Sequence, residues 1–525
     1  MSKLDVLIIN PSALEDIYQS LTKDYVAIET PIWAALIANH VRSKNYGVAI
    51  LDCEAEWLTA TQAAEKVGDY DPRIVAVVVY GQQPSASTQN MYGAGKVVTA
   101  IKERYPDKKI VLIGGHCTAL PQITLKQEKA DFVAQGEGLQ TLIGLLETKN
   151  LDDTASLKKV PGLWYRDESG TPTFTMPSQK VPQSEMANQL PGMAFDLLPM
   201  KNYRAHNWHA LTNGNDRQPY ASVYTSLGCP FKCSFCCINA PFGGSSFRYW
   251  NPEFMIKQFD TLANDYGVKN VKIADEMFVL KEKHFLELCK LLKQRDYGFN
   301  IWAYSRIDTA KPEHMKALKD AGVNWIVLGI ESYSKFVRDG VTKGRFTDDD
   351  IPKVVDMFRD HGINVMGNYI FGLPDDDYES MQLTLDTAIE LNTEWANFYS
   401  AMAYPGSQLY NMAITEGWRL PETWVGYSQH AKDCLPLPTK HLKAGEVLSY
   451  RDKAWEIYFQ NPKYLNLVRD KFGQEAFNHI LGMTKTKLAR SNTLSIPPEY
   501  PKRPYPIDDE YRRNLKQIGV EAPAP

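Results

Sequence analysis

The sequence predicts an α/β protein in three parts: a doubly wound parallel sheet at the N-terminus, a partial (β/α)6 barrel in the middle, and a mostly helical C-terminal region. Two observations lead to this prediction. In residues 1–148 and again in 216–403, short apolar runs alternate with segments whose apolar residues recur at helical spacing. Such alternation is typical of parallel sheets whose strands are joined by helices. A chain of 525 residues also has the length of about three domains.

Residues 1–148 contain five strand-like runs. The helix between the first two is expected to begin with Thr30 as its N-cap and Pro31 as its first residue. Ligands of doubly wound sheets bind at the carboxyl ends of the strands, where this sequence has loops of small and polar residues. The runs are 6–9, 48–51, 74–80, 110–113 and 132–134.

The middle of the chain predicts a connector and then a barrel. In residues 149–215, the runs 163–165 and 173–175 flank Gly170 and predict a hairpin, and a proline-rich stretch follows it. Residues 216–409 predict a partial barrel whose site lies at the carboxyl ends of its strands. The predicted strands are 223–226, 271–274, 300–304, 325–330, 365–371 and 395–401, and the helical patterns lie near 252–266, 281–294, 311–321, 350–361 and 377–391.

Residues 410–525 form the third part. The stretch 410–495 is predicted to be mostly helical, and its aromatic residues in 454–465 recur at helical spacing. That spacing is typical of a helix packed on the barrel, and the alternative is a lid over the substrate. The proline-rich tail from Ile496 is expected to be extended or disordered.

Composition and charge limit the function. The net charge of −4 argues against a broad nucleic-acid-binding surface, and a hydrophobic fraction of 44% is ordinary for a globular protein. No apolar run has the length of a membrane span, and the N-terminus does not resemble a signal peptide. We therefore expect a cytoplasmic protein, in which a disulfide framework among the eight cysteines is not expected.

Four of the eight cysteines lie between positions 229 and 237, directly after the first predicted barrel strand. Cys229, Cys233 and Cys236, at spacings of four and three residues, can ligate three irons of a cubane cluster and leave one iron open for another ligand. A structural zinc site is the alternative, but zinc prefers four closed protein ligands. Cys237 is expected to be a packing residue rather than a ligand.

This motif after a first barrel strand resembles the radical S-adenosylmethionine (SAM) superfamily, over about residues 216–410. The resemblance implies a [4Fe–4S] cluster whose open iron binds SAM, and reductive cleavage of SAM to a 5′-deoxyadenosyl radical. From the residues alone, Glu331 could instead form an ion pair within the barrel, and Arg306 could pair with Asp308. The SAM contacts that the resemblance implies are Phe235, Asp275, Glu276, Ser305, Arg306, Glu331, Asn368, Gly372, Pro405 and Gly406.

The first domain has Asn10-Pro11-Ser12 after its first strand, a small-residue segment at 114–121, and a segment at 131–138 that ends in Gly-Glu-Gly. With these segments it resembles the flavodoxin-like cobalamin-binding domain that precedes some radical SAM barrels. The resemblance implies a corrin over the strand ends, facing the barrel. The Asp-x-His-x-x-Gly signature of B12 methyl carriers is absent, so His116 is expected to hydrogen-bond the corrin or backbone rather than ligate cobalt. A flavodoxin-like domain without a ligand is the alternative. The implied cobalamin contacts are Asn10, Ser12, Gln83, Ser85, Gly114, Gly115, His116, Thr118, Gly136, Glu137 and Gly138.

Together the two resemblances imply a cobalamin-dependent radical SAM methyltransferase. It would move a methyl group from SAM through methylcobalamin to an unactivated carbon or phosphorus centre of a small molecule or biosynthetic intermediate, with electrons from a flavodoxin or ferredoxin. No catalytic residue beyond the cofactor contacts is assigned. The alternatives are an oxidative cyclase or ring-rearranging enzyme with the same cofactors, and a non-catalytic B12-responsive sensor. A methylthiotransferase is disfavoured, because only Cys53 and Cys117 lie in the first domain.

Overall fold

The structure is a computed structural model that describes residues 4–81, 83, 85–505 and 512–513. Its N-terminal half contains a sheet of order β2-β1-β3-β4-β5-β6-β7 within these residues. The first five strands are parallel, as predicted, and the predicted hairpin continues the same sheet as an antiparallel edge. The strands are β1 (Val6–Asn10), β2 (Val48–Asp52), β3 (Ile74–Val79), β4 (Lys109–Gly114), β5 (Phe132–Ala134), β6 (Leu163–Arg166) and β7 (Pro172–Phe174).

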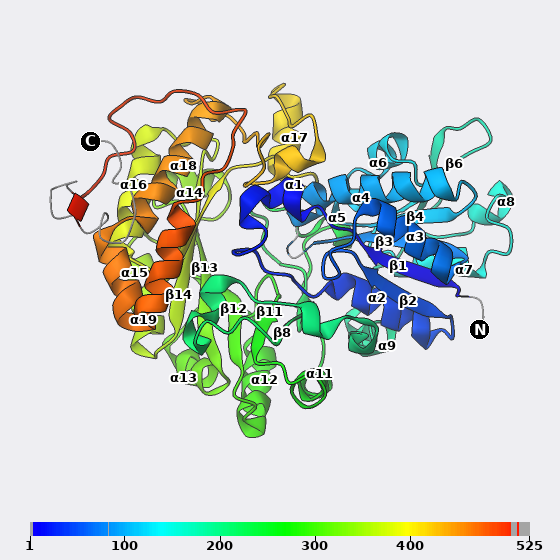
Figure 1. Cartoon of the computed structure of the whole chain (residues 1–525), viewed down its shortest axis with the longest axis horizontal. Helices are drawn as coiled ribbons and strands as arrows, with labels where there is room; N and C mark the ends of the chain where they lie inside the picture. Colours follow the sequence, from blue (N-terminus) through cyan, green and yellow to red (C-terminus); the bar gives the residue numbers. More distant parts are fainter. Residues whose placement is uncertain (1–3, 82, 84, 506–511, 514–525) are drawn as a thin grey trace.

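Helices cover both faces of this sheet (Figure 1). Successive strand residues point to opposite faces: Ile8 packs in the same core cluster as α2, whereas Leu7 and Ile9 pack with α3 and α4. This alternation makes the sheet doubly wound. Its helices are α1 (Leu14–Tyr18), α2 (Ile32–Ser43), α3 (Ala60–Tyr70), α4 (Ala86–Arg104), α5 (Gly115–Ala119), α6 (Pro121–Gln127), α7 (Leu139–Glu147) and α8 (Thr154–Leu157).

The predicted start of α2 is wrong by one residue. Pro31 is the N-cap, and Thr30 makes no cap hydrogen bond. The Thr30 hydroxyl instead accepts a hydrogen bond from the backbone N–H of Ser222, at 3.0 Å, on the first barrel strand. Thr30 therefore joins the two domains.

The second half contains the predicted partial barrel, an open sheet of order β15-β14-β13-β12-β11-β8 among the described residues. All of its pairings are parallel. The first strand starts three residues before the prediction, and Ser226 belongs to a short antiparallel ribbon. The strands are β8 (Tyr220–Val223), β11 (Asn270–Ile273), β12 (Asn300–Arg306), β13 (Val323–Glu331), β14 (Asn364–Phe371) and β15 (Trp395–Ser400), and the ribbon is β9 (Ser226–Leu227) with β10 (Arg248–Tyr249).

Helices line the outer face of the barrel sheet and continue into the C-terminal region (Figure 1). Helix α18 packs on β14 and β15. The bounds are α9 (Met186–Gln189), α10 (Asn207–Ala210), α11 (Pro252–Asn264), α12 (Glu282–Arg295), α13 (Pro312–Asp320), α14 (Lys335–Gly340), α15 (Asp350–Asp360), α16 (Tyr378–Leu391), α17 (Gln408–Thr415), α18 (Ala444–Phe459) and α19 (Pro462–Thr484).

The C-terminal region is less helical than predicted. Between α17 and α18 the described chain has one short 3-10 helix, Trp424–Tyr427, and residues 485–505 have no regular structure. The described part of the tail contains a turn and bends, and it is held in place: Lys502 donates its backbone N–H to Gln382, and Tyr500 stacks on Tyr378. The rest of the predicted tail lies outside the described residues, apart from 512–513.

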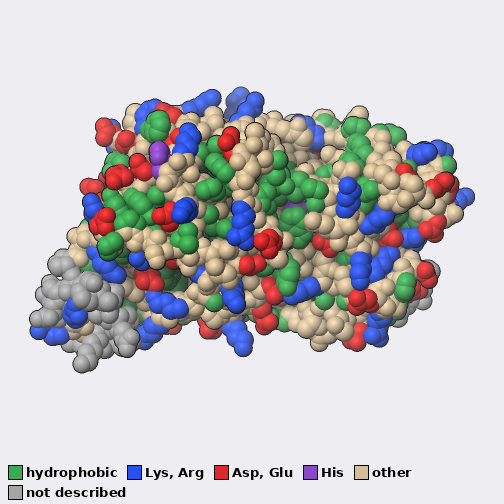
Figure 2. Space-filling model, turned by 90° about the horizontal axis from the view of Figure 1, so that it is seen from above, with side chains coloured by type: hydrophobic (Ala, Val, Ile, Leu, Met, Phe, Trp, Pro, Cys, Tyr) green, Lys and Arg blue, Asp and Glu red, His purple; other side chains and the backbone are tan. Residues whose placement is uncertain are grey.

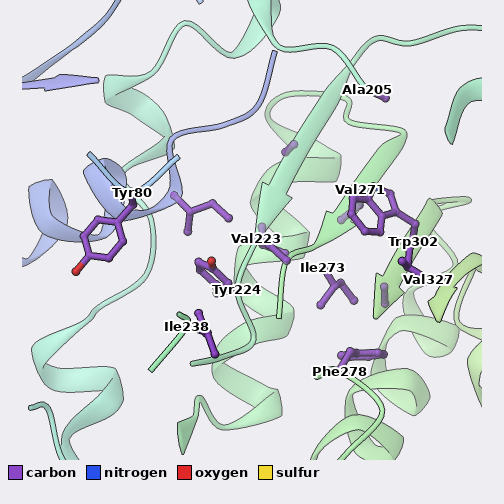
Figure 3. Close-up of a cluster of buried hydrophobic side chains, with 14 of the residues drawn as sticks. Tyr80, Ala205, Val223, Tyr224, Ile238, Val271, Ile273, Phe278, Trp302 and Val327 are labelled. Carbon is purple, nitrogen blue, oxygen red and sulfur yellow. The ribbon is translucent and has the colours of Figure 1, made fainter. Parts of the chain in front are cut away.

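The two domains share one hydrophobic core. Tyr80, at the end of β3, lies beside Tyr224 and Ile238 of the barrel domain (Figure 3). A buried ion pair reinforces this seam: Arg248 donates to Glu137 at 2.7 Å, and the other Glu137 oxygen accepts the backbone N–H of Val181. Among the described helices, none has the length and apolar character needed to cross a membrane.

Candidate functional site

A cavity of about 560 Å³ lies inside the half-barrel and reaches the N-terminal domain. Its wall combines inward-facing residues of the barrel strands, the cysteine loop, loop residues of the first domain and the cavity side of α18. Hydrophobic side chains gather between the two halves of the molecule on the face seen in Figure 2. A second, much smaller cavity of about 20 Å³ lies at the domain seam.

The three motif cysteines line the main cavity. Their loop begins at Gly228, whose φ of +83° and close approach to the Ser246 carbonyl both require glycine. Burial raises the pKa of Cys229 to about 11 and also raises that of Cys236, so both are thiols until a metal replaces the proton. No three His, Cys, Asp or Glu side chains of the described chain are placed to hold a single metal ion, but a cubane binds each thiolate through a different iron.

Cys237 also borders both cavities, but its thiol is buried beside the loop of Gly406. Burial raises the pKa of Cys237 to about 12. This environment agrees with the packing role expected from the sequence.

Six of the ten residues that the radical SAM resemblance implies line the main cavity. Glu276 is the least satisfied of them: its Oε2 atom is buried without a hydrogen-bond partner, and burial raises its pKa to about 8. Such an orphaned carboxyl oxygen fits an ammonium donor. The six residues are Phe235, Glu276, Ser305, Arg306, Glu331 and Asn368.

Arg306 and Glu331, for which the sequence left an ion pair as the alternative to a SAM contact, both form ion pairs. Arg306 pairs with Asp308 at 2.7 Å, and its Nη1 also lies 3.7 Å from the Cys233 sulfur. Glu331 pairs with Lys343 at 2.7 Å. An ion pair and a place in the cavity wall are therefore compatible for both residues.

The other four predicted SAM contacts do not line this cavity. Asp275 turns away from it and accepts hydrogen bonds from the Thr225 N–H and the hydroxyls of Thr225 and Ser226. Gly372 packs against Val447 of α18. Gly406 packs between Ala240 and Ala119, and Pro405 borders the small seam cavity. These four positions have structural explanations in the packing of their loops.

The predicted cobalamin contacts divide in the same way. Gln83 and Ser85 line the main cavity, and Gln83, Gly115 and His116 line the small one. His116 is buried: its Nδ1 lies 3.2 Å from the Thr88 hydroxyl, its ring packs edge-on against Trp424, and its Nε2 has no hydrogen-bond partner. Burial lowers the pKa of His116 to about 3, so the ring is neutral. An orphaned nitrogen at the domain seam fits a polar ligand there.

The remaining predicted cobalamin contacts are engaged within the protein. Asn10 donates to Asp52, Thr118 exchanges hydrogen bonds with the Gly136 backbone, and Glu137 holds Arg248. Added methyl groups at Gly114 and Gly138 would collide with Val79 and Ile113, so these glycines serve close packing around β3 and β4. Ser12 lies against Gly93 of α4 through its backbone.

Several cavity residues escaped the sequence analysis. Lys343 and Arg451 lie outside any motif, and Lys272 and Tyr399 are inward-facing positions of barrel strands. Strand alternation could have indicated Lys272 and Tyr399. No sequence signal marks Arg451, which reaches the site from α18.

Comparisons with known proteins agree with this geometry. A radical SAM superfamily model matches residues 223–388, and a B12 binding domain model matches residues 20–146. The chain is 30% identical to an uncharacterized methyltransferase of Pyrococcus horikoshii, over 85% of this chain and 91% of that protein. It is 25% identical to an anaerobic magnesium-protoporphyrin IX monomethyl ester cyclase of Rubrivivax gelatinosus, over 77% and 69%. The methyltransferase TsrM from Kitasatospora setae has the same fold, with 18% identity, a TM-score of 0.61 and coverage of 92% and 99%.

The fold and site define a cobalamin-binding radical SAM protein. The chain belongs to this family, together with the Pyrococcus horikoshii relative. Its cofactors are accordingly a [4Fe–4S] cluster, SAM and cobalamin. The residues present fit these groups, since three thiols share one cavity wall, a buried oxygen of Glu276 lacks a partner, and Gln83 and Ser85 bring polar side chains of the B12-binding domain to the same cavity.

Proposed function

We propose that this protein is a cobalamin-dependent radical SAM methyltransferase of class B. When bound, the cofactors supply a methyl group from SAM through methylcobalamin and a 5′-deoxyadenosyl radical that removes hydrogen from an unactivated carbon, or acts toward a phosphorus centre. The observation that carries the proposal is that one cavity is lined both by the three cysteines and by strand-end residues of the B12-binding domain, Gln83 and Ser85. Kinship to a methyltransferase supports the same function.

The residues of the chain have distinct tasks in this proposal. Cys229, Cys233 and Cys236 hold the cluster, and Glu276 holds the SAM ammonium group through its unpartnered oxygen. Arg306, already tied to Asp308, lies beside Cys233 and offers positive charge next to the cluster. These groups position SAM rather than react with the substrate.

The walls of the cavity also exclude water from a reactive radical. The N-terminal segment closes one side: Gln19 donates to the carbonyl of His430 at 2.6 Å and accepts the N–H of Ala489 at 3.1 Å. The ring of Tyr18 packs against His430 with centroids 5.3 Å apart. The first domain and the C-terminal region thereby cover the open side of the half-barrel together.

The substrate is proposed to be a small molecule or biosynthetic intermediate. The electron donor is proposed to be a flavodoxin or ferredoxin, because cleavage of SAM consumes one electron. We also propose that the protein works in the cytoplasm.

The test is anaerobic turnover of the reconstituted holoenzyme with SAM and a chemical reductant, using metabolite extract from a strain that lacks this gene. We expect S-adenosylhomocysteine and 5′-deoxyadenosine in comparable amounts, and a product one methyl group heavier than its precursor. Cys233→Ala should abolish 5′-deoxyadenosine and product. Turnover that yields 5′-deoxyadenosine and product without S-adenosylhomocysteine would reject methyl transfer.

That last outcome would favour an oxidative cyclase. The observation behind this second candidate is the identity of 25% with the Rubrivivax gelatinosus cyclase. Both reactions need the same cofactors and the same cavity, so only the products separate them.

A further inference from the structure

A cluster of three charged residues at the cavity wall, Arg451, Asp452 and Arg490, carries surplus positive charge. Arg451 and Arg490 bind the same carboxylate: Arg451 Nη1 donates to Asp452 Oδ1 at 2.7 Å, and Arg490 Nε donates to Oδ2 at 2.8 Å. Burial acts to raise the pKa of Asp452, but the two guanidinium groups hold it below its ordinary value. Because both arginines stay charged and one carboxylate balances one of them, about one positive charge remains.

Only one of these arginines borders the cavity. Arg490 spends its nitrogens on Asp452 and on the carbonyls of Ala431 and Gln429, and it is not part of the cavity wall. Arg451 lines the cavity and is only 6% exposed.

Arg451 is also held in one orientation. Its Nε donates to the Phe398 carbonyl at 2.7 Å, on the free edge of β15, and its Nη1 holds Asp452. No hydrogen bond to a described residue uses its Nη2. A guanidinium that is held in one orientation and has a free Nη2 is preorganised to bind an anion, because its side chain loses little further entropy on binding.

The other cations in the described wall of the cavity have partners of their own. Lys343 pairs with Glu331, Lys272 with Glu29, Arg306 with Asp308, and Lys487 with Glu456. The surplus charge is therefore localised at Arg451. The anion that it fits would come from a molecule inside the cavity.

The residues near Arg451 indicate which chemical groups the rest of the ligand would contact. Trp455 follows Arg451 by one helical turn and also lines the cavity. Tyr399 lines the same cavity as Arg451 and Glu331. Burial first and then Glu331 raise the pKa of Tyr399 to about 12, while Arg451 opposes that rise. A ligand held by Arg451 therefore shares one cavity with the residues expected to contact SAM.

We propose that the substrate carries a single carboxylate, bound by Arg451, on an apolar or aromatic body that packs against Trp455. That this molecule is the substrate depends on the proposed function, whereas the anion-binding site itself depends only on the contacts of Arg451. A phosphate ester carries about −1.5 to −2 charges at pH 7, more than the one surplus charge available, so a carboxylate is the better match.

The test is isothermal titration calorimetry of the reconstituted, SAM-loaded protein with three probes that share a phenylethyl body: 3-phenylpropionate, 3-phenylpropanamide and 2-phenylethyl phosphate. We expect the carboxylate to bind at least about tenfold more tightly than the neutral amide, in line with a charge-assisted hydrogen bond. Equal affinities for carboxylate and amide in the unmodified protein would overturn the proposal. Tighter binding of the phosphate than of the carboxylate would overturn the choice of a singly charged group.

Two variants locate the effect. Arg451→Gln should reduce the carboxylate-to-amide preference to near one, and Arg451→Lys should retain part of it. Arg469→Gln removes an exposed arginine of α19 outside the cavity wall and should leave the preference unchanged. A preference that survives in folded Arg451→Gln would overturn the assignment. Because the measurement involves no methyl transfer, failure to form S-adenosylhomocysteine would refute the proposed function and leave the subsite standing.

Discussion

Single residues decide which cofactor the site can hold. The cysteine loop shows this most clearly, since four cysteines lie in one short segment and differ in environment. All four cysteines border the main cavity, but Cys229, Cys233 and Cys236 are partly or fully exposed in it, while Cys237 is buried with the loop of Gly406 against it. Metal binding therefore depends on which thiols face the same space, and that is testable.

Alanine at Cys229, Cys233 or Cys236 should remove most of the iron from the reconstituted protein, because an Fe–S cluster loses a required thiolate. Iron and sulfide analysis with the absorbance spectrum measures this. Cys237→Ala is the matched control and should keep full iron content. Loss of the cluster in that control would show that Cys237 is a ligand.

His116 is the residue whose role the B12-binding fold leaves most open. Of the two cavities described above, it borders the small seam cavity of about 20 Å³, which has room for about one water molecule and not for a corrin face. We therefore expect no His116 nitrogen on cobalt. The EPR spectrum of the Co(II) form should be the same in His116→Ala. Disappearance of a nitrogen splitting in that variant would identify His116 as the ligand.

At the scale of elements, the site depends on how α18 packs against the barrel. The free edge of β15 is covered by side chains: Arg451 donates to the Phe398 carbonyl, and Gln429 bonds both the N–H and the carbonyl of Ser400. Such cover replaces the strand that a closed barrel would place there. Helix α18 thus both closes the sheet edge and supplies Arg451 to the cavity.

Gly372 tests this packing. Its φ is +79°, and an added Cβ would lie 2.3 Å from Val447 of α18. Gly372→Ala should lower the free energy of unfolding by about 2–4 kcal/mol, from backbone strain and overpacking together. Gly170→Ala is a matched control, because Gly170 has the same φ of +79° with nothing within 4 Å. Denaturant titrations measure the free energy of unfolding. An equal decrease in the two variants would show that the collision with Val447 of α18 adds no destabilisation.

At the scale of the whole molecule, the domains are joined by groups that the B12-binding domain or the barrel domain alone would leave unpaired. Glu137 follows β5 and Arg248 begins β10, and both side chains are almost fully buried. Burial of a charge without its partner is costly, so this pair holds the two domains together at the seam.

Glu137→Gln should destabilise the protein by about 3–5 kcal/mol, because it leaves the Arg248 charge buried without a counter-ion. Thermal unfolding measures this, and limited proteolysis of residues 149–215 should become faster. Removal of the exposed pair partner Glu103, which contacts Lys129, should change the melting temperature little. A Glu137→Gln protein as stable as that control would mean that the seam does not depend on the ion pair.

The sequence by itself determined most of the fold and the centre of the site. Apolar alternation located all five parallel strands of the first sheet and five of the six in the barrel, because periodicity depends only on the pattern along each segment, and it placed the first barrel strand three residues too late. The three cysteines lie within eight positions, so one loop brings them together whatever the rest of the chain does. The same local character made the hairpin around Gly170 predictable.

Only the tertiary structure decided which neighbours face the cavity and which distant residues join them. Asp275 and Glu276 are adjacent after β11, and the register of the sheet turns one under the loop and the other into the cavity. Thr30 is not the N-cap that the sequence predicts. Its hydroxyl accepts the backbone N–H of Ser222, which is buried at the domain seam and needs a hydrogen-bond partner. Arg451 enters the site from more than two hundred residues after Cys229, through the docking of α18 on β15. Contacts of this kind depend on packing across the whole chain, and no local pattern encodes them.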